Sequence, residues 1–89
     1  MPRARDLSDP QRIQEWERIR CLVGSRIREL RVANRMTQES LALKSGLSRN
    51  LLVDVELGKS GLLYERLFDL AAALGVAPSE FLAVTDKTN

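Results

Sequence analysis

Histidine is absent from this 89-residue chain, and cysteine occurs once, at Cys21. Zinc sites are built mainly from His and Cys, so one chain cannot assemble such a site here, and a single cysteine cannot form a disulfide within the chain. The commonest general base is also missing, the carboxylates are scattered, and no glycine-rich phosphate loop occurs. These absences predict a protein that is not an enzyme and that holds no metal or other cofactor.

Long apolar runs are missing as well. Nothing approaches the ~18 consecutive apolar residues of a membrane span, and the N-terminal sequence MPRARDLSDP lacks the apolar middle region of a secretory signal. We therefore expect a soluble protein of the cytoplasm that contacts no membrane. Hydrophobic residues make up 44% of the chain and charged residues 29%, which is near the average of globular proteins and sufficient for one small packed domain.

The net charge of +2 is unevenly distributed along the chain. Residues 1–35 contain nine arginines against five acidic residues (+4), residues 36–60 contain three of each sign, and residues 61–89 contain two basic against four acidic residues (−2). The planar guanidinium of arginine suits phosphate, although arginine-rich helices are also ordinary solvated surfaces. An anionic partner is therefore expected to prefer the N-terminal third.

The apolar residues recur at spacings of three and four, and no stretch alternates as a half-buried strand would, which predicts an all-α chain. Asp9, Thr37 and Ser48 are typical N-caps, and several helices are followed by a glycine, a typical helix end. Gly24 leaves open whether the first helix is continuous or divided in two. The expected helices span residues 10–34, 38–45, 48–57, 63–74 and 78–82.

Residues 37–59 (TQESLALKSGLSRNLLVDVELGK) contain two of these short helices, joined by a three-residue turn. Such a pair crosses steeply, which requires a small residue where the helices meet and a glycine at the turn. Ala42 and Gly46 occupy these places. Leu52 and Val55 then anchor the second helix on the first, and its opposite face is left open to enter a DNA major groove, which is about 12 Å wide.

Residues 24–82 resemble the Cro and lambda-repressor-like helix-turn-helix family, also called the XRE family. The segment 67–82 (LFDLAAALGVAPSEFL) is similar to the family's fourth and fifth helices, and the matching positions in the two central helices are Gln38, Ala42, Gly46, Leu52, Val55, Glu56 and Gly58. The resemblance implies an all-α, five-helix lambda-repressor-like DNA-binding domain, here with an N-terminal helical extension. We expect a basic arm and helical extension (1–23), the helix-turn-helix domain (24–83) and a flexible tail (84–89).

The resemblance also implies a function. The chain is expected to be a sequence-specific transcriptional regulator, a repressor, that occupies double-stranded operator DNA at the nucleoid as a homodimer, with no small-molecule ligand. The helix 48–57 is expected to read the major groove. The resemblance assigns base contacts to Ser48, Arg49, Asn50 and Asp54, phosphate contacts to Gln38, Lys59 and Ser60, and a structural salt bridge to Arg31 and Glu56.

Several of these residues can also have a purely structural role. Ser48 can act only as a helix cap, Gln38 can be a polar residue of a first helical turn, and Lys59 can be a solvated side chain of a loop. Asp54 stands where relatives often carry arginine or glutamine, and a carboxylate near DNA is repelled unless it accepts from cytosine N4. Val53 and Leu57 on the same face suit thymine methyls or a protein surface. The alternative function is therefore a protein-interaction module, such as the antitoxin or a regulatory subunit of a toxin pair.

Three apolar residues, Ile13, Trp16 and Ile19, lie ahead of the part that resembles the family and form one stripe of the first helix. Either they fold back onto the chain's own core, or they form the interface of a homodimer, because helix-turn-helix proteins commonly bind paired half-sites about 34 Å apart. Arg3 and Arg5 are candidates for an arm that follows a DNA groove.

Overall fold

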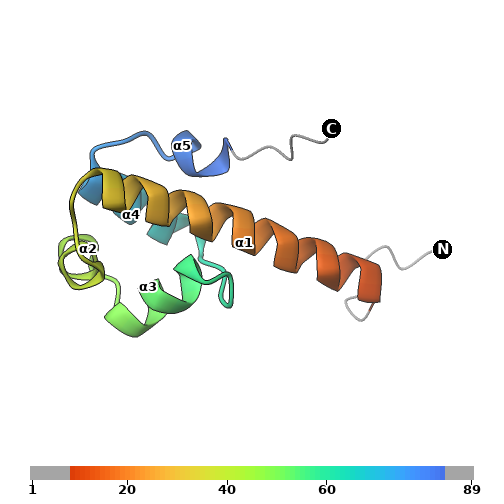
Figure 1. Ribbon diagram of the computed structural model, residues 1–89. Helices are drawn as coiled ribbons and strands as arrows, with labels where there is room; N and C mark the ends of the chain where they lie inside the picture. The colour runs from red at the N-terminus through yellow and green to blue at the C-terminus, as the bar shows by residue number, and fades with distance from the viewer. Residues whose placement is uncertain (1–8, 84–89) are drawn as a thin grey trace.

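The computed structural model describes residues 9–83. These residues form five helices, labelled in Figure 1: α1 (Pro10–Ala33), α2 (Gln38–Ser45), α3 (Arg49–Glu56), α4 (Tyr64–Leu74) and α5 (Ser79–Leu82). No strand occurs within residues 9–83, and the prediction of an all-α fold is confirmed. The predicted tail (84–89) and the two arginines of the predicted arm, Arg3 and Arg5, lie outside the described residues.

The first three helices begin where a side chain caps them. Asp9, Thr37 and Ser48 each accept a hydrogen bond from a backbone N–H two or three residues ahead, at 3.0 to 3.1 Å, which satisfies one of the unpaired donors of the first turn. Gly46 and Gly75 end α2 and α4 in the left-handed conformation, with φ of 84° and 72°. These caps and ends confirm the boundaries expected from the sequence.

Gly24 does not interrupt α1, which is a single continuous helix. Its role lies in packing, because a Cβ atom at this position would stand 2.1 Å from the carbonyl oxygen of Val55 in α3. The backbones of α1 and α3 approach each other too closely for any side chain. The expected domain boundary between residues 23 and 24 therefore falls inside a helix, at the point where α1 meets α3.

The core lies between the C-terminal half of α1 and the four shorter helices (Figure 1). Every helix contributes to it, so that one apolar cluster holds the domain together. Its buried members are Ile27, Leu41, Ala42, Leu47, Leu52, Val55, Leu70, Ala71, Ala73, Leu74 and Phe81.

The short helix α5 is fixed to α1 by Arg26. Its guanidinium donates to the backbone carbonyl of Glu80 at 3.0 Å and to the carboxylate of Glu80 at 2.8 Å, and it also contacts the carboxylate of Glu29 at 3.0 Å. The hydrogen bonds to Glu29 and then to Glu80 raise the pKa of Arg26 above its ordinary value. The two bonds from Arg26 to Glu80 tie α5 to the C-terminal half of α1.

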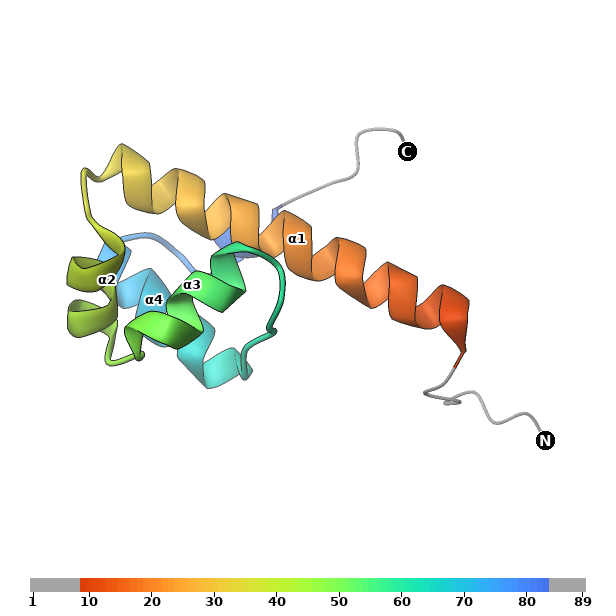
Figure 2. The same ribbon diagram turned by 60° about the horizontal axis from the view of Figure 1, so that its bottom comes forward.

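The N-terminal half of α1 projects away from the rest of the described chain, as Figures 1 and 2 both show. Ile13, Trp16 and Ile19 are 36%, 37% and 43% exposed. Within residues 9–83, Ile13 and Trp16 do not fold back onto the core, so that alternative is wrong for these two residues, whereas Ile19 lines a cleft beside the core. No helix of the described part of the chain is both long and apolar enough to cross a membrane.

Candidate nucleic-acid interface

The turn between α2 and α3 has the geometry that the sequence predicts. Gly46 is left-handed, Leu47 is buried, and Ser48 caps α3, because its hydroxyl oxygen accepts a hydrogen bond from the N–H of Leu51. In Figure 1 α2 is seen nearly end-on while α3 runs across the view, so the two helices cross steeply. Ala42 is 4% exposed, in keeping with the small residue required at such a crossing.

The two faces of α3 differ sharply in burial. Leu52, Val55 and Glu56 are buried against α1 and α2, which confirms the inward direction predicted for the two apolar residues. Figure 2 brings the opposite face of α3 forward, with no other helix of the described residues in front of it. The exposed residues on and beside α3 are Ser48, Arg49, Asn50, Asp54 and Leu57, while Val53 is half-buried.

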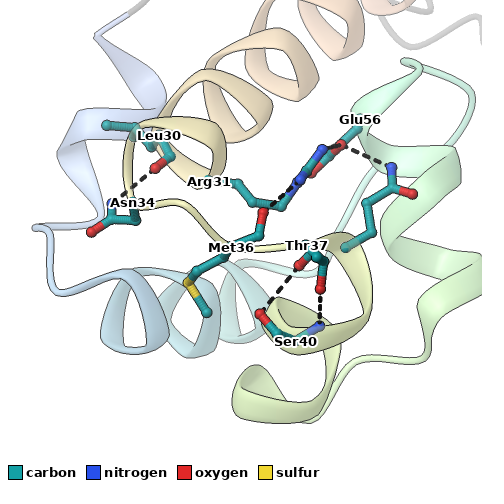
Figure 3. Close-up of polar contacts among 8 residues, drawn as sticks. Leu30, Arg31, Asn34, Met36, Thr37, Ser40 and Glu56 are labelled. Carbon is teal, nitrogen blue, oxygen red and sulfur yellow. Dashed lines mark hydrogen bonds and ion pairs between the residues drawn. The ribbon is translucent and has the colours of Figure 1, made fainter.

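Arg31 of α1 and Glu56 of α3 form a two-pronged ion pair (Figure 3). Nε and Nη2 of Arg31 donate to the two carboxylate oxygens at 2.7 and 3.0 Å, and the side chains are only 11% and 2% exposed. Arg31 Nη1 also donates to the carbonyl oxygen of Met36 at 2.8 Å. Because a buried charge is costly unless it is paired and hydrogen-bonded, these partners make the pair tolerable inside the domain. It joins α1 to the end of the helix expected to read DNA.

Gln38 belongs to the same network. Its Nε2 donates to Glu56 Oε1 at 3.0 Å, so the amide bridges the first turn of α2 to the last turn of α3. Thr37 caps the N–H of Ser40, which leaves the N–H groups of Gln38 and Glu39 without a partner inside the helix. The first turn of α2 is therefore held in place by Gln38 and presents backbone donors of the kind that bind phosphate.

The loop after α3 holds the other two residues expected to contact phosphate. Lys59 is exposed, and its backbone N–H donates to the carbonyl of Asp54 at 2.8 Å, which fixes the loop against the end of α3. Ser60 is half-buried, and its hydroxyl donates to the carbonyl oxygen of Gly61 at 3.0 Å. Lys59 thus has the exposure that a phosphate contact requires, whereas the proton of Ser60 is already in use.

Sequence reasoning missed the parts of this network that depend on backbone position. The carbonyl of Met36 accepts from Arg31 because the turn after α1 folds back, and this turn contains Arg35 at a φ of 58°, the left-handed region that non-glycine residues seldom adopt. The bond from Gln38 to Glu56 joins residues 18 positions apart. The resemblance named both Gln38 and Glu56, but neither composition nor spacing signals that they touch.

Comparisons with known proteins agree with this geometry. The family model for helix-turn-helix domains matches residues 27–81. The chain is 39% identical over 70 residues to the uncharacterized HTH-type transcriptional regulator y4dJ of Sinorhizobium fredii, a match that covers 79% of this chain and 91% of that protein. It is 34% identical over 72 residues to the control protein C.BamHI of Bacillus amyloliquefaciens, covering 80% of this chain and 89% of the relative.

Among solved structures, the restriction-modification controller protein C.AhdI of Aeromonas hydrophila superposes with a TM-score of 0.69 at 39% identity, covering 70% of this chain and 94% of that one. These three relatives are named as a transcriptional regulator, a control protein and a controller protein, and the match covers about nine-tenths of each of them. The family match begins at Ile27, in the half of α1 that is packed against the core, and ends at Phe81 in α5. The chain therefore belongs to the helix-turn-helix family of DNA-binding transcriptional regulators, the XRE family.

Proposed function

We propose that this regulator binds a specific operator in double-stranded DNA as a homodimer, with one α3 helix of each copy in the major groove, and that it represses by occupying the operator. The observation that carries the proposal is the division of α3 into a buried face, formed by Leu52 and Val55, and an exposed face. A major groove admits one helix, and a helix held in this way presents the same side chains to every site it meets.

Base recognition is assigned to the exposed start of α3. Arg49 suits the O6 and N7 atoms of guanine, Asn50 suits the N6 and N7 atoms of adenine, and Asp54 can accept from cytosine N4. Ser48 holds the helix start through its cap and lies at the same end. The exposure of all four residues supports this assignment.

Phosphate contacts are assigned to the first turn of α2 and to the loop after α3. Gln38 contributes mainly by holding the turn whose backbone N–H groups face the phosphate, since its amide is bonded to Glu56. Lys59 contributes a charge, and Ser60 contributes an acceptor or a rotated hydroxyl. Such contacts set the register of the protein on the duplex without reading sequence.

The homodimer is supported by the exposed stripe of Ile13, Trp16 and Ile19, and by the usual symmetry of operators for this kind of protein. Two of the similar proteins are named as control or controller proteins, one of them for a restriction-modification system. We propose the same kind of role here, in the cytoplasm at the nucleoid, where the DNA lies.

The experiment selects binding sites from a random DNA library and then measures affinity for the selected site and a scrambled site by fluorescence anisotropy. The change Arg49→Ala should cost roughly 1 to 3 kcal/mol on the selected site and little on the scrambled one, because a bidentate base contact discriminates by that amount. Arg28→Ala, an exposed arginine on α1, is the matched control. Equal losses on both sites would show that Arg49 does not read bases.

The salt dependence of binding distinguishes an operator-binding protein from a protein-interaction module. DNA affinity should fall steeply between about 50 and 200 mM salt because phosphate contacts release counterions, whereas an apolar protein contact barely responds. A chain that enriches no sequence from the library and shows no salt-dependent binding is not an operator-binding protein.

A further inference from the structure

The projecting end of α1 carries a stripe of four residues whose spacing is the same counted from either end. Asp9, Ile13, Trp16 and Arg20 follow one another at spacings of four, three and four. At 3.6 residues per turn they fall within an arc of about 60° on the helix, so they form one narrow line along it. The line begins with an acid, ends with a base, and has two large apolar side chains between them.

The two ends of this stripe are both equipped for a partner. Asp9 is exposed, and its Oδ1 accepts from the N–H of Gln11 at 3.0 Å, while its backbone carbonyl accepts from the N–H of Ile13. Arg20 is half-buried, and its Nε is enclosed by its own chain without a hydrogen-bond partner in the described residues. Only the outer nitrogens of its guanidinium can therefore meet an acceptor of a second copy.

The middle of the stripe is apolar and uncovered. Ile13 and Trp16 are 36% and 37% exposed, and the guanidinium of Arg12 lies over the Trp16 ring, 5.6 Å from its centre, at the distance of a cation–π contact. A large apolar surface on a projecting helix is typical of an interface.

We propose that two copies of this chain pair through these ends of α1 in antiparallel orientation. The twofold axis passes between Gln14 and Glu15, so that Asp9 of each copy bonds to Arg20 of the other and Ile13 of each copy packs on Trp16 of the other. This inference rests on the proposed homodimer and gives it an interface and a register. Symmetric spacing with opposite charges at the two ends is what a twofold interface requires, because each residue must match its counterpart on an identical surface.

The pairing also suits the shape of the molecule. Figure 2 shows that the N-terminal part of α1 projects beyond the other helices. Because only this part takes part in an antiparallel pair, the proposal places the two domains at opposite ends of the helix pair. The tip of each helix then reaches the mouth of a cleft of about 200 Å³ in the other copy. That cleft is lined in large part by Ile19, Arg20, Val23, Leu62, Leu67 and Leu82.

Cysteine cross-linking tests the register directly. In a Cys21→Ser background, the double variant Asp9→Cys/Arg20→Cys should form a covalent dimer on mild oxidation. Positions 9 and 20 lie about 16 Å apart along one helix, too far for a disulfide within one chain, since Cα atoms must lie within about 7 Å. Each single variant should stay uncross-linked. A single variant that cross-links with itself, or a double variant that does not cross-link, overturns the proposal.

Charge reversal gives a second measurement that needs no oxidation. Asp9→Lys and Arg20→Glu should each raise the dissociation constant of the dimer about tenfold in sedimentation, and the double reversal should restore it to within about threefold. Asp9→Asn, which keeps the cap and removes the charge, checks that an effect at position 9 is not merely loss of the helix. Failure of the double reversal to rescue association contradicts the ion pair.

Measuring operator binding and association on the same variants distinguishes a failure of this interface from a failure of the proposed function. A protein that binds the selected operator but shows no cross-link and no response to charge reversal retains its function and lacks this interface. A protein that cross-links as expected but selects no DNA has the interface and lacks the function. Phe68→Ala, at an exposed aromatic residue of α4, is the control substitution and should leave association unchanged.

Discussion

The two halves of α1 have similar apolar stripes and opposite surroundings. In the C-terminal half Ile27 is fully buried and Arg31 is paired with Glu56 of α3, whereas in the N-terminal half Ile13 and Trp16 are more than one-third exposed. The helix itself is continuous across the two halves. Helix periodicity therefore shows which residues share a face, and only the path of the rest of the chain shows whether that face is covered within one molecule.

The largest loss of stability is expected when the ion pair that anchors the C-terminal half of α1 is broken. Glu56→Gln removes the partner of a buried guanidinium and should lower the free energy of unfolding by about 3 to 5 kcal/mol, measured by urea denaturation. The control is Asp69→Asn, because the pair of Asp69 with Arg66 is more than 40% exposed on both side chains and should contribute less than about 1 kcal/mol. Equal effects at the two sites would mean that burial does not distinguish them.

A truncation in each half sharpens the comparison. Ile27→Ala should cost about 2 to 5 kcal/mol of stability, because the cavity it leaves lies in a packed core. Ile13→Ala should change the stability of dilute protein by no more than about 0.5 kcal/mol, since the residue is exposed there. Urea denaturation at low protein concentration measures both. A large loss for Ile13→Ala in a monomer would show that the N-terminal half has a partner within its own chain.

Gly24 lies at the boundary between the two halves of α1, and a substitution there should cause a smaller loss of stability. Gly24→Ala forces a methyl group against the carbonyl of Val55 and should destabilise the protein by about 1 to 3 kcal/mol, although alanine is the better helix former. Ser25→Ala, at the exposed neighbouring position, should be nearly neutral or slightly stabilising. If Gly24→Ala raises the melting temperature as Ser25→Ala does, then α1 and α3 are not in close contact at this point.

Much of the fold could be predicted because it depends on local chemistry. The caps Asp9, Thr37 and Ser48 and the glycines after α2 and α4 determine where helices begin and end through hydrogen bonds and backbone angles within a few residues. The burial of Leu52 and Val55 followed from helical spacing alone. With the inward face of α3 assigned, the exposed candidates Arg49 and Asn50 followed as well.

The rest depends on contacts between distant residues, which spacing does not encode. The place of Gly24 against α3 became clear only when the two helices were seen to touch, and the same holds for the bond of Gln38 to Glu56 and for the buried Nε of Arg20. In the sequence Gly24 looked like a possible break in the helix. In the structure it is a point of close approach.

The sequence by itself determined the helices, their inward faces and the helix-turn-helix unit, because these follow from interactions among residues no more than a few positions apart. Only the tertiary structure decided that α1 runs unbroken past Gly24, that its first half stands away from the domain, and that Gln38 supports the Arg31–Glu56 pair. Those outcomes depend on how closely separate helices approach, and that distance is decided by the packing of all of them together.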